Sequence, residues 1–243
     1  MVFIRKSDII LYEVYKIMKK FCVILLFVFV CFCITSCSDN KKSDSLKFKL
    51  EYESINNLKN DNNKKYREVN ISSDNPFVYA TASSIVEKIN NNETFIVFFA
   101  FKECPWCRSV VEELIKAAKD SDVSTIYYVD VKDIRDIKKV DNGQVVDVKS
   151  GSPAYMQLID NFDNVLDDYT LDGVSVSEKR IYAPNLIAVS NGKAIKLETG
   201  ISDELKDPYQ DLTDSIKSFS YNKFKCLMKC LEEESTTCKK NSC

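Results

Sequence analysis

The sequence predicts an α/β domain with a central mixed sheet flanked by helices. Two apolar runs rich in β-branched and aromatic residues, "TFIVFFAF" at 94–101 and "VSTIYYVDV" at 123–131, indicate buried strands. A helical repeat of apolar residues separates them, and strands joined by such a crossover pair in parallel. Asn191–Gly192 lies between two further apolar runs and is a strong hairpin signal, so it adds an antiparallel edge.

The remaining pattern places the other elements in order. We expect a β, α, β, α, β series, then a long insert with one helix, a hairpin and a final helix. The expected elements are an extended piece at 66–72, a helix within 76–92, the strand 94–101, a helix over 104–120, the strand 123–131, the insert 132–182 with helical spacing at 153–169, the hairpin 183–198 and a helix within 209–235.

Composition excludes several classes of function. The chain of 243 residues has a net charge of -2, which gives no reason to expect nucleic acid as a partner. It contains five glycines and neither a Walker loop nor a Gly-rich phosphate cradle, so no cofactor is expected. It contains no histidine, which excludes Cys-His and Ser-His hydrolase machinery.

The first 37 residues have the pattern of a secretory signal. Lys19 and Lys20 precede an apolar run over 21–34, and the segment ends in "ITSC". This ending resembles the bacterial lipobox, in which the cysteine, here Cys37, is lipidated and becomes the mature N-terminus. Residues 1–17 then represent an over-extended start. An uncleaved membrane helix is the alternative, because the apolar run is near the short limit for spanning.

The segment 38–65 is polar and is interpreted as a tether that holds the domain off the membrane. The expected location is the outer face of a bacterial membrane, with the lipid bilayer as a partner through the anchor. Six cysteines remain outside the membrane, and an even number in an oxidising compartment favours disulfides.

Cys104 and Cys107 form a CxxC motif at a strand-to-helix junction. A cysteine at a helix N-terminus faces unpaired N–H groups and the positive end of the dipole, which favour the reactive thiolate. Pro105 suits the first helical turn, and Arg108 is expected to add positive charge. Two alternatives to a redox pair are half of a zinc site and two inert buried thiols. Because the chain has no histidine, a zinc site here would need further cysteines as ligands, and no metal is expected.

The chain resembles thioredoxin-fold proteins, including thioredoxin-like bacterial lipoproteins of the bacteriocin-transport accessory type. The resemblance rests on "CPWC", the element order, and "YAPNLIAV" ahead of the Asn–Gly hairpin. It implies a thioredoxin-like domain over 66–225 with Pro184 as a cis-proline. Two features depart from thioredoxin: the dipeptide Pro105–Trp106, and Phe98 in place of a buried aspartate six residues before the first cysteine.

The resemblance implies a membrane-anchored extracytoplasmic thiol-disulfide oxidoreductase. Cys104 would be the nucleophile and Cys107 the resolving thiol, with Pro105, Trp106 and Ala183 contacting protein thiol or disulfide substrates. A membrane redox partner would recycle the pair. The alternative is a redox-silent binding or accessory lipoprotein that uses the same fold.

The tail 226–243 carries four more cysteines, Cys226, Cys230, Cys238 and Cys243. Nested structural disulfides, Cys230 to Cys238 and Cys226 to Cys243, would staple a tail that otherwise frays. Two other interpretations of these four cysteines remain: a zinc knot that uses all four thiols, and a second redox pair.

Overall fold

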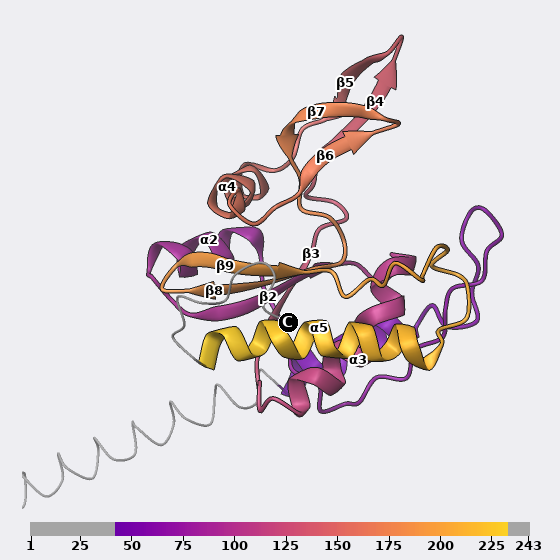
Figure 1. Ribbon diagram of the computed structural model, residues 1–243, viewed down its shortest axis with the longest axis vertical. Helices are drawn as coiled ribbons and strands as arrows, with labels where there is room; N and C mark the ends of the chain where they lie inside the picture. Colours follow the sequence, from indigo (N-terminus) through magenta and orange to yellow (C-terminus); the bar gives the residue numbers. More distant parts are fainter. Residues whose placement is uncertain (1–41, 233–243) are drawn as a thin grey trace, which may run out of the picture. The chain divides into compact units, whose positions relative to one another are not determined.

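The computed structural model describes residues 42–232, and Figure 1 shows how their elements are arranged. A helix covering residues 42–53 comes first. The elements that follow are β1 (Phe77–Tyr79), α2 (Ala82–Asn90), β2 (Phe95–Ala100), α3 (Pro105–Lys119), β3 (Ile126–Asp130), β4 (Ile137–Asp141), β5 (Gln144–Lys149), α4 (Pro153–Phe162), β6 (Asp168–Leu171), β7 (Val174–Lys179), β8 (Asn185–Ser190), β9 (Lys193–Glu198) and α5 (Asp214–Glu232).

Five strands form the mixed sheet that the sequence predicts, in the order β1-β3-β2-β8-β9. β3 pairs in parallel with both β1 and β2, while β8 runs antiparallel to β2 and to β9. All six residues of β2 are buried, as expected for a strand covered on both faces. The predicted α/β class is therefore confirmed.

The alternation of side chains along the central strands divides the core into two layers. Phe98 and Ala100 point into a layer shared with α3, α5 and the 42–53 helix, whereas Val97 and Phe99 point into a layer shared with α2 and α4. Figure 1 shows these two groups of helices on opposite faces of the sheet. The layer under α3 is the one that contains Cys104 and Cys107.

The first strand is not where the sequence pattern predicts it. Residues 66–72 form no strand, and β1 lies within the segment expected to be helical. Side chains satisfy the backbone of the earlier segment instead: Asn56 accepts from Val69 N and donates to Val69 O, and Glu53 accepts from Ile71 N. α2 begins only after Thr81, which caps it together with Ser84.

The interpretation of 38–65 as a polar tether is wrong for residues 44–65. Asp44 is the first residue of the compact unit, and the 42–53 helix packs Phe48 and Tyr52 into the core, where both are 0% exposed. The Phe48 ring stacks on Phe77, with centroids 4.0 Å apart. Two aromatic side chains on one helical face are enough to dock a helix whose remaining residues are mostly polar or exposed.

The insert 132–182 contains more structure than the single helix expected. α4 is present, but two hairpins, β4–β5 and β6–β7, flank it and project away from the sheet in Figure 1. Asn142–Gly143 and Asp172–Gly173 have positive φ at both turn positions, as a type I′ turn requires. Both turns therefore carry the same kind of turn signal that correctly predicted the hairpin at Asn191–Gly192, and it was not used at these two positions.

The predicted signal peptide with Cys37, and the tail residues Cys238 and Cys243, lie outside the described residues. Within 42–232, no helix combines the length and apolarity needed to cross a membrane. Near the end of α5, Cys226 and Cys230 are both buried and both disulfide-bonded.

Candidate active site

The candidate site lies at the junction between the end of β2 and the start of α3. Cys104 is the N-cap of α3, with extended backbone angles, and Pro105 occupies the first helical turn. The Cys104 Sγ accepts a hydrogen bond from Cys107 N at 3.2 Å, which satisfies one of the free N–H groups of the first turn. The sequence-based placement of Cys104, Pro105 and Cys107 is therefore confirmed.

Cys104 and Cys107 are free thiols, and both are buried, with 4% and 0% of their surface exposed. The pKa of Cys107 is raised well above its ordinary value, first by burial and then by the Cys104 side chain. Burial also opposes ionisation of Cys104, but hydrogen bonds from the Cys107 side chain and from the Cys107 and Trp106 N–H groups outweigh it, and its pKa is lowered. Cys104 is the more acidic and slightly more exposed thiol, as the helix-cap argument predicts.

The antiparallel pairing of β8 with β2 brings a segment from 79 residues later against the cysteines. Cys104 Sγ lies 3.2 Å from Ala183 O and donates to it when protonated. The Ala183–Pro184 peptide bond is cis, as predicted, and Asn185 opens the strand. A scan of protein-family models and a search of curated proteins find no match for this chain.

Arg108 does not have the position expected of a residue that tunes the thiol. Its guanidinium is buried and donates to Arg67 O at 2.7 Å, to Tyr52 O at 2.8 Å and to Asn56 Oδ1 at 2.6 Å. A further bond reaches Lys102 O at 3.3 Å. This arginine therefore ties the N-terminal segment to α3, immediately after Cys107.

Arg135, from the loop after β3, is the cation that lowers the pKa of both thiols, although burial and the local hydrogen bonds have larger effects. Its guanidinium lies over the Phe101 ring, 5.0 Å from the centroid. Sequence reasoning missed this residue because it lies at the start of the insert, 31 positions after Cys104 by residue number. Only the parallel pairing of β2 and β3 shows that the two loops share one edge of the sheet.

Trp106 and Ala183, both expected to contact substrate, are partly buried and pack against the core around the cysteines. Pro105 is also partly exposed. The loop 206–210 lies near the same helix end, because Ser109 Oγ is 3.2 Å from Pro208 O. Tyr209 in that loop accepts from Asn60 Nδ2 at 2.7 Å, so residues from before β1 and after β9 border the site together.

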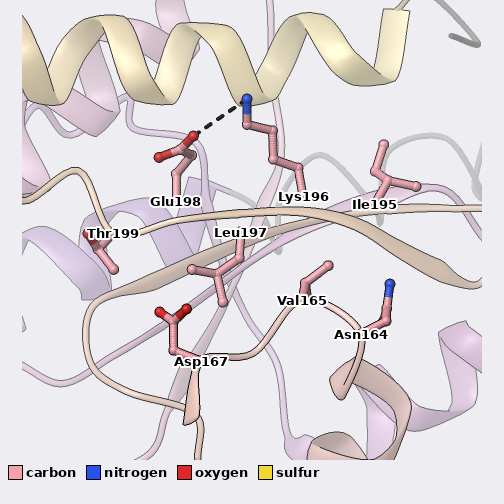
Figure 2. Close-up of a pocket in the computed structure, with 8 residues that line it drawn as sticks. All are labelled: Asn164, Val165, Asp167, Ile195, Lys196, Leu197, Glu198 and Thr199. Atoms are coloured by element: carbon pink, nitrogen blue, oxygen red, sulfur yellow. Dashed lines mark ion pairs between the residues drawn. The ribbon is translucent and has the colours of Figure 1, made fainter. Parts of the chain in front are cut away.

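Two surface hollows lie elsewhere and include none of the predicted site residues. Figure 2 shows the first, of about 340 Å³, between the outer strand β9 and the turn after α4, where Lys196 pairs with Glu198 at 3.5 Å. The second, of about 360 Å³, is lined by carboxylates that include Glu53 and Glu112. Glu53 pairs with Lys49, and Glu112 accepts from Asn70 N, so both carboxylates have partners.

Proposed function

We propose that this chain is a thiol-disulfide oxidoreductase with a thioredoxin-like fold, acting on protein thiols or disulfides through Cys104 and Cys107. The observation that carries the proposal is the unequal pair: an N-cap thiol of lowered pKa that touches Ala183 O, and a fully buried partner of raised pKa. The sheet order and the position of Pro184 at the start of β8 support the fold assignment.

The chemistry follows from this inequality. The Cys104 thiolate attacks a substrate disulfide, forms a Cys104–substrate bond and releases the other substrate sulfur as a thiolate. Cys107 then loses its proton and attacks Cys104 Sγ; the Cys104–Cys107 bond forms and the second substrate sulfur leaves with the electron pair. The substrate is reduced by two electrons and the protein is oxidised. The reverse sequence oxidises a substrate dithiol.

Pro105, Trp106 and Ala183 are the proposed substrate contacts, because each is partly exposed and lies beside Cys104. Pro184 has no backbone N–H. An extended substrate peptide beside Ala183 would therefore donate its own N–H groups to the backbone carbonyls there. In the proposed setting the chain is anchored through Cys37 to the outer face of a bacterial membrane. A membrane redox partner there would regenerate the pair, and neither a cofactor nor a metal is required.

The test is to trap the intermediate and to measure the equilibrium. Cys107→Ser should accumulate mixed disulfides between Cys104 and client proteins, and Cys104→Ser should not. The equilibrium between Cys104–Cys107 and glutathione gives the direction: a potential near about -270 mV supports a reductase and one near about -120 mV an oxidase. A pair that does not exchange with glutathione, with nothing trapped on Cys104, would sink the proposal.

The alternative is a redox-silent binding lipoprotein. The low exposure of Cys104, 4%, is the observation in its favour, because a substrate sulfur must reach that atom. The same two substitutions separate the alternatives, since a binding protein keeps its ligand when both cysteines are replaced by serine.

A further inference from the structure

The loop 206–210, between β9 and α5, contains no helix or strand, yet side chains of its own fix its backbone. Asp207 Oδ1 accepts from Tyr209 N at 2.9 Å. Gln210 Oε1 accepts from Lys206 N at 3.1 Å and from Asp207 N at 3.2 Å, and its Nε2 donates to Glu204 O at 3.2 Å. The steps of the proposed exchange use none of these residues, although the loop lies beside the site.

Arg67 ties this loop to the helix that carries the cysteines. Its guanidinium donates from Nη2 to Pro208 O at 3.1 Å and also to Gln210 O, so one cation holds the carbonyls on both sides of Tyr209. The carbonyl of Arg67 accepts from Arg108 Nε at 2.7 Å. The segment before β1 therefore connects the loop to the first turn of α3.

The loop also meets the N-terminal end of α3 directly. Ser109 Oγ lies 3.0 Å from Pro105 O and 3.2 Å from Pro208 O, so its hydroxyl stands between the loop and the residue that follows Cys104. Tyr209, next to Pro208, is partly exposed. Burial raises the pKa of Tyr209, and nearby negative groups, Cys104 among them, raise it further, which agrees with this placement.

The side chain of Tyr209 is anchored at its far end. Its hydroxyl accepts from Asn60 Nδ2 at 2.7 Å, while the residue remains partly exposed. A tyrosine that is already anchored loses little conformational freedom when a ligand packs on its ring. The ring is therefore a preorganised contact surface for an apolar group that approaches the attacking thiol.

Two other partly exposed aromatic residues border the same end of α3. Trp106 lies between the two cysteines in the sequence, and the Tyr66 ring centroid is 5.9 Å from the guanidinium carbon of Arg108. With Tyr209 they place three partly exposed rings near the first turn of the helix. Rings of this kind favour apolar side chains of a polypeptide as their contacts.

We propose that Tyr209 is a specificity-determining residue of the exchange site: its ring contacts an apolar side chain next to the reacting cysteine of a protein substrate, and Arg67 positions it. The inference rests on the proposed exchange function and adds the substrate class, namely polypeptides with apolar residues beside the cysteine. Such a contact speeds the capture of substrate by Cys104 and leaves the chemistry of the thiol unchanged.

The probes separate recognition from chemistry. Two peptides each carry one cysteine as a mixed disulfide with nitrothiobenzoate, and they differ only in having leucine or serine on both sides of that cysteine. The Cys104 thiolate attacks the peptide sulfur; the Cys104–peptide bond forms, and nitrothiobenzoate leaves as a coloured thiolate with the electron pair. The symmetrical nitrobenzoate disulfide contains no peptide and reports the thiols alone: Cys104 releases the first equivalent of colour and Cys107 the second.

The full chain is used in detergent, with serine at the cysteines of the N-terminal segment, namely Cys22, Cys31, Cys33 and Cys37. A chain that also lacks Cys104 and Cys107 gives the background. Each peptide rate is divided by the rate of the same peptide with glutathione, which removes differences in intrinsic reactivity. The ratio of the two corrected rates, leucine over serine, is the selectivity.

The wild-type chain should have a selectivity of about tenfold, the low end of what an apolar contact contributes. Tyr209→Ala should reduce it to about twofold or less, and Arg67→Gln should reduce it in the same direction, while both react with the symmetrical disulfide within about twofold of the wild type. Tyr209→Phe should keep the selectivity, because the ring makes the contact. Tyr221→Ala is the matched control and should also keep it, since the Tyr221 hydroxyl is bonded to Asp120 Oδ2, at 2.9 Å, at the opposite end of α3.

A trapped complex tests the contact without relying on rates. In Cys107→Ser, the leucine peptide stays on Cys104 as a mixed disulfide. Tyr209→p-benzoylphenylalanine should crosslink to that peptide on illumination, and Tyr221→p-benzoylphenylalanine should not. Fluorescence of Trp106, the single tryptophan, checks that each variant is folded, and the crosslink decides if Tyr209→Ala is not.

The outcomes separate this inference from the proposed function. A wild-type chain that releases no second equivalent from the symmetrical disulfide overturns both. A wild type that exchanges without selectivity, a Tyr209→Ala chain that keeps the selectivity, or a trapped peptide that does not crosslink overturns the role of Tyr209 alone. Equal slowing of Tyr209→Ala with all three probes also contradicts it, because the residue would then serve the stability of the site. Full selectivity in Arg67→Gln overturns the positioning role of Arg67.

Discussion

Two cysteines three residues apart have opposite shifts in pKa because they meet the same helix end differently. Cys104, at the cap, receives the N–H groups of the first turn, whereas Cys107, inside the helix, is desolvated and meets the Cys104 sulfur. Arg135 adds a favourable charge from another loop. Reactivity at this site is thus built from local helix geometry and one long-range cation.

Arg135→Gln should raise the pKa of Cys104 and slow its alkylation several-fold at neutral pH. The sign follows because removing a positive charge destabilises the thiolate, so less of it is present at a pH below the pKa. Iodoacetamide labelling, followed by peptide mass analysis as a function of pH, measures the change. Lys139→Gln removes the same charge from an exposed position in β4 and should leave the rate unaltered. Equal slowing by both substitutions would refute a specific role for Arg135.

Arg108→Met should lower the free energy of unfolding by roughly 2–4 kcal/mol, because hydrogen bonds to charged groups contribute about 1.5–3 kcal/mol each and are not additive. The substitution leaves Tyr52 O and Arg67 O without their donor. Arg108→Lys should recover only part of the loss, since an ammonium cannot reach the same set of acceptors. Urea unfolding followed by Trp106 fluorescence gives the values. Full recovery by lysine would show that charge, and not the fork of donors, is what matters.

Among the elements, the 42–53 helix provides the clearest test, because its burial was unexpected. Phe48 is 0% exposed and stacks between Tyr52 and Phe77. Phe48→Ala should destabilise the fold by about 3–5 kcal/mol, the usual cost of truncating a buried aromatic residue. Leu50→Ala, on the same helix but 58% exposed, should change stability by about 0.5 kcal/mol or less. Similar values for the two variants would mean that this helix does not belong to the core.

Across the whole molecule, two sets of cysteines stand in different chemical states. Cys104 and Cys107 are free thiols, while Cys226 and Cys230 are disulfide-bonded and buried at the end of α5. α5 packs against α3 and against both β8 and β9, so its last turns form part of the same framework as the site. The nested pairing with Cys238 and Cys243 remains a prediction.

A graded reduction should separate these two sets. After mild oxidation, low concentrations of dithiothreitol followed by alkylation should label Cys104 and Cys107 first, because a strained or functional pair opens more easily than a structural one. Cys226 and Cys230 should be labelled only under denaturing reduction. Intact-mass and peptide analysis report the order. Tail cysteines that open together with Cys104 would instead favour the second redox pair.

Much of the site was predictable because its signals are local. A cysteine followed by proline at the start of an amphipathic repeat predicts the N-cap of α3, and the apolar run before it predicts β2. Asn191–Gly192 predicts the β8–β9 hairpin because these two residue types readily take the positive φ that the turn adopts. The same rule applied to Asn142–Gly143 would have found β4–β5.

Other features depend on contacts between residues far apart in sequence, which no local pattern records. Arg108 was expected to lower the pKa of the neighbouring cysteine. Its guanidinium instead donates to Tyr52 O of the docked 42–53 helix and to Arg67 O in the segment that follows. Arg135 acts on the thiols only because parallel pairing places the ends of β2 and β3 at one edge. Helix caps, turns and buried strands depend mainly on residues that are neighbours in the sequence, so the sequence predicts them. The partners of a buried charge or hydroxyl are decided only when distant segments pack, because burial makes an unpartnered polar group costly.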